Sequence, residues 1–148
     1  MTALPLGPQL IGQTEKSLSA LLDRALDGRL TEPQWVTLRL AHVLEDETGA
    51  DAGTDAGLAA AVADRARFAD APALVDGLVA AGLLTAGRPT PAGRQLVAAI
   101  QARIALAADP IWQDLDPADV AAASRVLNEV LGRARAVLAG PRAASHPR

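Results

Sequence analysis

Apolar residues recur every three or four positions along most of this chain, a spacing that predicts a succession of amphipathic helices. In residues 9–26, for example, leucine and isoleucine side chains gather on one broad helical face. The predicted helices cover residues 9–26, 31 to about 44, 56–67, 70–81, 91–109 and 116–139. In the fourth of them we expect Leu74, Val75, Leu78 and Val79 to face inward.

Polar residues at the predicted helix starts have the spacing of N-terminal caps. Thr31 and Gln34 form the pattern of a capping box, in which each side chain bonds the other residue's backbone N–H. Thr90 followed by Pro91 places a capping hydroxyl before a proline at the first helical position. Asp116 is a third N-terminal signal.

A very short hairpin is predicted between the fourth and fifth helices. Gly82 is the expected residue just past the C-terminus of the fourth helix. The segment 83–90 then has two short extended pieces around Ala86-Gly87, a pair suited to a two-residue turn. The fold class we expect is therefore all-α with a very small β-hairpin.

Two stretches interrupt the helical pattern. Residues 45–57 contain a quasi-repeat of glycine, alanine and aspartate, and we expect a mobile loop there. At Asp109-Pro110 the missing proline N–H predicts that the long fifth helix is kinked or broken. The last helix instead keeps an unbroken heptad spacing, formed by Val120, Ser124, Leu127, Leu131, Ala134 and Leu138.

Composition and charge narrow the possible functions. The chain has 148 residues, a net charge of −3 and no cysteine, which suits one domain and excludes disulfides and thiol chemistry. We see no glycine-rich phosphate loop and no nucleophile-elbow serine, so we expect neither an enzyme nor a cofactor. Charges interrupt the apolar runs and no secretion signal is visible, so we expect a cytoplasmic protein that does not span a membrane.

The order of these elements resembles the multiple-antibiotic-resistance regulator (MarR) family of winged-helix transcription factors. Three segments carry the resemblance: residues 30–35 opening the second helix, 78–84 ending the fourth, and 90–94 after the hairpin. It covers roughly residues 9–139. The resemblance implies a winged helix-turn-helix fold in a single domain over residues 1–148. The lobe would span about 31–90, and the dimerisation helices about 9–26 and 91–139.

A homodimer with two DNA-binding lobes is what this family fold implies, often with a small-molecule pocket. The residues expected at the dimer interface are Leu10, Val120, Leu127, Leu131 and Leu138. Double-stranded DNA is the expected partner, and the candidate phosphate contacts are Arg65, Arg67, Arg88 and Arg94. These arginines are equally compatible with a solvated surface or with ion pairs to neighbouring acids.

The chain departs from the family pattern where DNA is read. The hairpin is shorter than usual, and Arg88 is its only charged residue. The expected reading helix, residues 70–81, has only Asp70 and Asp76 as polar side chains, and both repel phosphate. A protein of this fold that no longer reads DNA, and binds a small molecule or a protein instead, is therefore the alternative hypothesis.

Two further groups of residues have the types found in binding sites. Trp35, Arg39, His42 and Trp112 are candidates to line a pocket for a small aromatic or anionic effector. The other interpretation is a core tryptophan beside a histidine near the helix C-terminus. His42 with Glu45 and Asp46, and Asp51 with Asp55, have partial metal-ligand patterns. Neither pattern is complete, so we predict no metal site.

Overall fold

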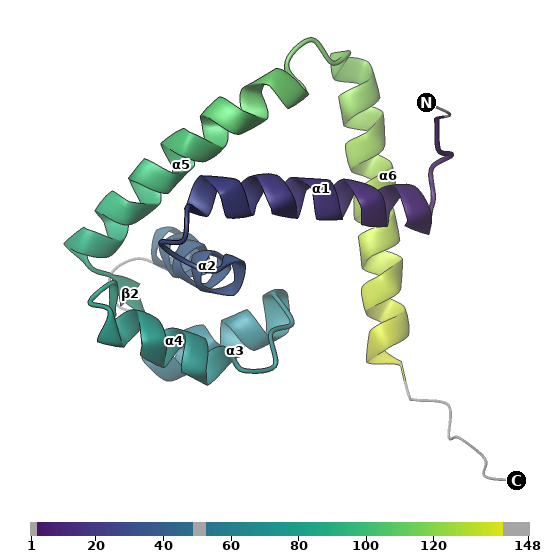
Figure 1. Cartoon of the computed structure of the whole chain (residues 1–148). Helices are drawn as coiled ribbons and strands as arrows, with labels where there is room; N and C mark the ends of the chain where they lie inside the picture. Colours follow the sequence, from purple (N-terminus) through teal and green to yellow (C-terminus); the bar gives the residue numbers. More distant parts are fainter. Residues whose placement is uncertain (1–2, 49–52, 141–148) are drawn as a thin grey trace, which may run out of the picture. The chain divides into compact units, whose positions relative to one another are not determined.

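The computed structural model describes residues 3–48 and 53–140, and it is mostly helical (Figure 1). The helices are α1 (Pro8–Leu26), α2 (Glu32–Thr48), α3 (Asp55–Arg65), α4 (Ala71–Ala80), α5 (Pro91–Trp112) and α6 (Pro117–Ala139). Strands β1 (Leu84–Thr85) and β2 (Arg88–Pro89) form a two-stranded antiparallel hairpin between α4 and α5. The coarse prediction, all-α with a very small hairpin, is confirmed.

The chain divides into two compact units, residues 1–110 and residues 111–148. The first unit holds α1 to α4, the hairpin and most of α5. The second holds the end of α5 and all of α6. Among the described helices, none is long and apolar enough to cross a membrane.

The predicted caps form as expected. The Thr31 N–H donates to Oε1 of Gln34 at 2.9 Å, and the Gln34 N–H donates back to Oγ1 of Thr31 at 3.4 Å. Oγ1 of Thr90 accepts from the Gly93 N–H at 3.1 Å, and Oδ1 of Asp116 accepts from the Ala118 N–H at 2.7 Å. These bonds satisfy N–H groups that the first helical turn leaves without partners, so they determine where α2, α5 and α6 begin.

Helices α2 and α3 end at other residues than predicted. Helix α2 continues through the expected loop to Thr48, where the Thr48 hydroxyl bonds the Leu44 carbonyl. Helix α3 ends at Arg65 rather than at residue 67, and Arg67 adopts φ +60° in the turn that follows. Of the loop expected at residues 45–57, the four residues 49–52, including Asp51, lie outside the described residues.

Two further features concern the start of α4 and the end of α5. Asp70 precedes α4, but its side chain makes no capping hydrogen bond, since its backbone has φ −112° and ψ 44° rather than an extended conformation. Helix α5 continues through Pro110 to Trp112, so it is not broken there, and a kink at Asp109-Pro110 stays a prediction; the boundary between the two units falls at Pro110. A proline close to the C-terminus of a helix removes one N–H donor without ending the last turn.

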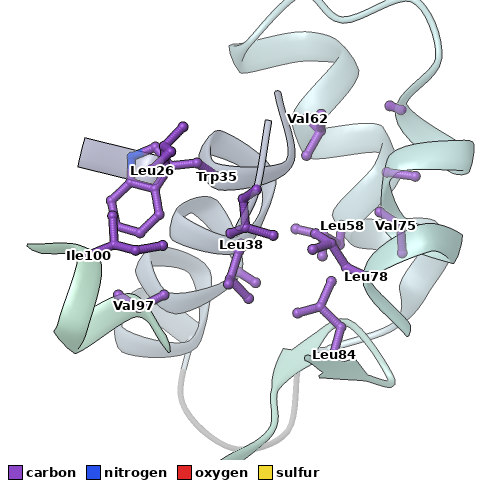
Figure 2. Close-up of a cluster of buried hydrophobic side chains, with 14 residues drawn as sticks. Leu26, Trp35, Leu38, Leu58, Val62, Val75, Leu78, Leu84, Val97 and Ile100 are labelled. Atoms are coloured by element: carbon purple, nitrogen blue, oxygen red, sulfur yellow. The ribbon is translucent and has the colours of Figure 1, made fainter. Parts of the chain in front are cut away.

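The hydrophobic core of the first unit contains side chains from each of the helices α1 to α5. In Figure 2, Leu38 of α2 lies between two groups of side chains. One group contains Leu26, Trp35, Val97 and Ile100, and the other contains Leu58, Val62, Val75, Leu78 and Leu84. Among the described residues, Thr37 is the one buried polar side chain, and it donates its hydroxyl proton to the Pro33 carbonyl at 2.8 Å. Burial of these apolar side chains is the main force holding α2, α3 and α4 together.

Candidate nucleic-acid interface

Helix α4 has one buried face and one exposed face. Ala71, Val75 and Leu78, spaced by four and three residues, are at most 1% exposed. On the opposite side of the helix, Ala73, Asp76, Gly77 and Ala80 are exposed, and we call these four residues the outer face of α4. Val79, which was expected inside, is 37% exposed, because it lies about 80° around the helix from Ala71. Apart from Asp76, the outer face has no side chain longer than a methyl group.

The end of α4 leads directly into the hairpin. Gly82 has φ +74°, its N–H donates to the Val79 carbonyl, and the Leu83 N–H donates to the Leu78 carbonyl at 2.9 Å. This confirms Gly82 as the residue past the C-terminus. Ala86 and Gly87 have φ +48° and +71°, the pattern of a two-residue type I′ turn. Leu84 then faces Pro89 across the hairpin, and Thr85 faces Arg88.

The tip of the hairpin is held against the N-terminus of α3. The Gly87 N–H donates to Oδ1 of Asp55 at 2.6 Å, and Gly87 is buried. A Cβ built on Gly87 would clash with the carbonyl oxygen of Thr54, the residue that caps α3. The hairpin therefore does not project as a free arm. In the sequence Asp55 belongs only to a partial metal-ligand pattern, and nothing in its local pattern identifies this contact across 32 residues.

Two of the four candidate arginines are paired with acids at the end of α2. Arg94 of α5 binds Glu45 through both terminal nitrogens, at 2.7 and 2.8 Å. This hydrogen bond lowers the pKa of Glu45 and raises that of Arg94. Arg65 lies 3.3 Å from Glu47, with both side chains about half exposed. Such an exposed single contact is weak, so Arg65 can exchange it for a phosphate.

The other two arginines have no ion pair in the described part of the chain. Arg67 is exposed in the turn between α3 and α4. Arg88, on β2, is half-buried and lies over Gly53, so that a Cβ on Gly53 would stand 2.9 Å from its Cγ. Arg65 and Arg67 therefore stand near each other in sequence beside the start of α4, whereas Arg88 and Arg94 contact the α2 end and the segment before α3.

The four candidate pocket residues have different environments. Trp35 is 7% exposed and belongs to the hydrophobic core. Arg39 and His42 are half-buried on α2, and Nδ1 of His42 lies 2.9 Å from the Leu38 carbonyl oxygen. Trp112 is 57% exposed and belongs to the second unit. The core interpretation therefore describes Trp35, and an effector pocket that includes these residues stays a prediction.

Two of the described residues with metal-ligand patterns have other contacts. Glu45 binds Arg94, and Asp55 binds the Gly87 N–H. Within residues 3–48 and 53–140, no three histidine, aspartate or glutamate side chains gather in a way that suits a metal ion.

The second unit displays most of the expected dimer interface. No residue of α6 is buried, and Val120, Leu127, Leu131 and Leu138 are between 39% and 71% exposed. Trp112, Leu115, Val120 and Leu127 line an apolar hollow of about 330 Å³ at the start of α6. Leu10, on α1 of the first unit, is half-buried.

Comparisons of the chain with protein-family models, with curated proteins and with solved structures give no match.

Proposed function

We propose that this chain is a DNA-binding transcriptional regulator in which residues 31–90 form a winged helix-turn-helix lobe and α4 enters the major groove. The observation that carries the proposal is the combination of an exposed outer face on α4 with a hairpin immediately after it. Helix, turn, exposed helix and hairpin, in this order, form a common module for reading DNA.

The short side chains on α4 favour a close approach to DNA. Ala73, Gly77 and Ala80 keep the helix narrow on its outer face, so its backbone can lie deep in a groove about 12 Å wide. Because the hairpin tip is held against α3, we expect α4 and the turn before it to make the contact with DNA. Arg65 at the end of α3 and Arg67 within that turn supply the positive charge that phosphates require.

A homodimer would have two such lobes for binding DNA. The heptad positions of α6 give each chain an exposed apolar row that a second copy can cover, with Leu10 and the rest of α1 contributing. A small aromatic or anionic effector would then act by changing the spacing between the two lobes.

The runner-up is a protein of this fold that binds a small molecule or a protein instead of DNA. The observation that favours it is the acidic character of the lobe. Arg65 and Arg94 are paired with glutamates, and the groove of about 490 Å³ between α3 and α4 is lined by alanines, Pro72 and Val75, with Asp55 and Asp76 as its charged residues.

A DNA titration distinguishes the two hypotheses. Fluorescently labelled duplex from the gene's upstream region, and a scrambled duplex of equal composition, are titrated between roughly 50 and 200 mM salt. The regulator hypothesis predicts modest affinity that falls steeply with salt. Replacing both Arg65 and Arg67 by alanine is expected to weaken binding to both duplexes about equally, and to reduce the salt slope by about one unit per lost phosphate contact.

Arg29→Ala is the matched control, because Arg29 is an exposed arginine in the connection between α1 and α2. It should leave the slope unchanged. Absence of binding at the lowest salt contradicts the regulator hypothesis and favours the runner-up. If Arg29→Ala reduces the salt slope as much as the loss of Arg65 and Arg67 does, the lobe does not contact phosphates through the turn before α4.

The effector is tested by fluorescence. A Trp112→Phe variant retains only the emission of the buried Trp35. Aromatic carboxylates of the benzoate type are expected to change this emission saturably, and Arg39→Ala is expected to weaken the response. A set of such compounds without a saturable change would contradict the effector pocket on α2.

A further inference from the structure

The outer face of α4 has a hydrogen-bonding character that limits which bases it can read. Asp76 is its only side chain with hydrogen-bonding atoms, and an ionised carboxylate only accepts hydrogen bonds. In the described part of the chain, Asp76 takes part in no ion pair. Its oxygens are therefore available to a donor outside the protein.

Only two major-groove groups can donate to Asp76. They are the N4 amino group of cytosine and the N6 amino group of adenine. On adenine the amino group stands next to N7, an acceptor that repels a carboxylate, whereas cytosine has no acceptor in the major groove. Asp76 therefore favours cytosine over adenine, and it disfavours guanine, which presents two acceptors.

The methyl groups on the outer face add a second preference. Alanine side chains in the major groove pack against the C5 methyl group of thymine. Ala73 lies three residues before Asp76 and Ala80 four residues after it, which is about 4.5 Å and 6 Å along the helix axis. Base pairs are about 3.4 Å apart along the duplex axis, so these distances span at most two base pairs on each side, whatever the tilt of the helix in the groove.

We propose that α4 selects a half-site in which a cytosine, recognised by Asp76, is flanked within two base pairs by thymines that contact Ala73 and Ala80. This inference rests on the proposed function and specifies the DNA that α4 prefers. The cost of bringing one carboxylate near the phosphates is offset by Arg67 and Arg65 at the turn before α4. Mismatched DNA leaves the Asp76 carboxylate desolvated without a donor, so Asp76 acts mainly by rejecting wrong sequences.

Selection from a random duplex library tests the cytosine preference. Enriched sites of the unmodified protein are expected to share a cytosine at one position of the half-site. Asp76→Asn is expected to change that position to adenine, because an asparagine amide pairs with adenine N6 and N7. The same variant should bind random DNA more tightly, since one repulsive charge is gone. Asp64→Asn, at an exposed aspartate on α3, is the matched control and should keep the cytosine.

Replacing thymine by uracil in the selected site tests the methyl contacts. Removal of one contacted methyl group is expected to weaken binding about fourfold, and replacement at other positions should have no effect. The Ala73→Gly variant should bind equally well whether thymine or uracil stands at the position that Ala73 contacts. The same should hold for Ala80→Gly at the position that Ala80 contacts.

The outcomes separate this inference from the function on which it rests. If the protein binds DNA but Asp64→Asn and Asp76→Asn select the same sites, the role of Asp76 is wrong and the regulator hypothesis stands. The inference is also overturned if the enriched sites lack a common cytosine or tolerate every uracil. If no duplex binds at low salt, both the inference and the proposed function fail.

Discussion

The core of the first unit and helix α6 contain the same types of apolar residue in opposite environments. Leu38, Val62 and Leu78 in the core are completely buried, whereas Leu127, Val130 and Leu131 on α6 are 44–47% exposed. The period of three and four residues is equally clear in both regions. Periodicity therefore identifies the apolar side of a helix, but it does not tell what covers that side.

From this difference we infer that the apolar residues of the two regions stabilise different structures. The leucines of the core stabilise the folded lobe through burial within one chain. An isolated helix gains little stability from its own hydrogen bonds, and most helical stability comes from packing an apolar face. We therefore propose that the heptad row of α6 stabilises an assembly of two chains, and the following predictions test this division.

The largest effect is expected for a leucine of the core. Leu78→Ala should lower the free energy of unfolding by about 2–5 kcal/mol, because it leaves a cavity between α3 and α4. Leu106→Ala is the matched control, since Leu106 is 78% exposed and its replacement should change stability by less than about 0.5 kcal/mol. Urea unfolding followed by circular dichroism measures both. Equal effects would show that Leu78 is not in a packed core.

The next prediction is that formation of the dimer depends on the apolar row of α6. Leu127→Asp is expected to convert a dimer into monomers or to unfold α6, because an interface does not accept an unpaired charge. Ala136→Asp places the same charge on the opposite side of α6 and should leave the dimer intact. Light scattering at micromolar concentration gives the mass. A monomeric unmodified protein, or equal effects of both variants, would contradict the proposed interface.

The hairpin provides a smaller and purely local test. Gly82 and Gly87 both have positive φ values, but a Cβ on Gly82 meets nothing, whereas one on Gly87 clashes with Thr54. Gly82→Ala should therefore cost about 1 kcal/mol of stability, from backbone strain alone. Gly87→Ala should cost more, because it also separates the hairpin from α3. Equal losses in thermal unfolding would indicate that the hairpin tip is not held.

The smallest expected effect is a pH dependence at Glu45. Arg94 holds the pKa of Glu45 below its ordinary value of 4.5, so this pair stabilises the fold above pH 4.5. That contribution is lost as the pH falls from 4.5 through the lower pKa of the folded state. For a pair this exposed it amounts to less than about 1 kcal/mol.

Glu45→Gln should therefore flatten the stability curve below pH 4.5. Part of the slope should remain, because Arg103 lowers the pKa of Asp27 in the same way. An unchanged curve would show that the Arg94 pair contributes nothing to the folded state.

Local signals in the sequence were sufficient for much of the fold. The capping box at Thr31, the turn at Ala86-Gly87 and the cap at Asp116 involve residues within a few positions, and all three are confirmed. The errors come from tertiary contacts. Helix α2 extends to Thr48, with Glu45 held by Arg94 and Glu47 by Arg65, and these partners come from other helices.

The candidate site was predictable only in part. The spacing of apolar residues predicts a helix over residues 70–81, and the family resemblance makes it the expected reading helix, whereas the candidate arginines follow from their residue type. The pairing of two arginines and the contact between Asp55 and Gly87 depend on how α2, α3 and the hairpin pack. Such contacts are determined by the folded chain as a whole, so no local pattern indicates them.

Protection of a single cysteine from alkylation shows whether the outer face of α4 contacts DNA. The chain has no cysteine, so Ala80→Cys on α4 and Ala102→Cys on α5 each introduce one exposed thiol. Alkylation rates are measured with and without saturating upstream duplex at low salt. We predict that DNA slows alkylation at position 80 at least tenfold and leaves position 102 unchanged. Equal alkylation rates at position 80 with and without bound DNA would show that the outer face of α4 does not contact DNA.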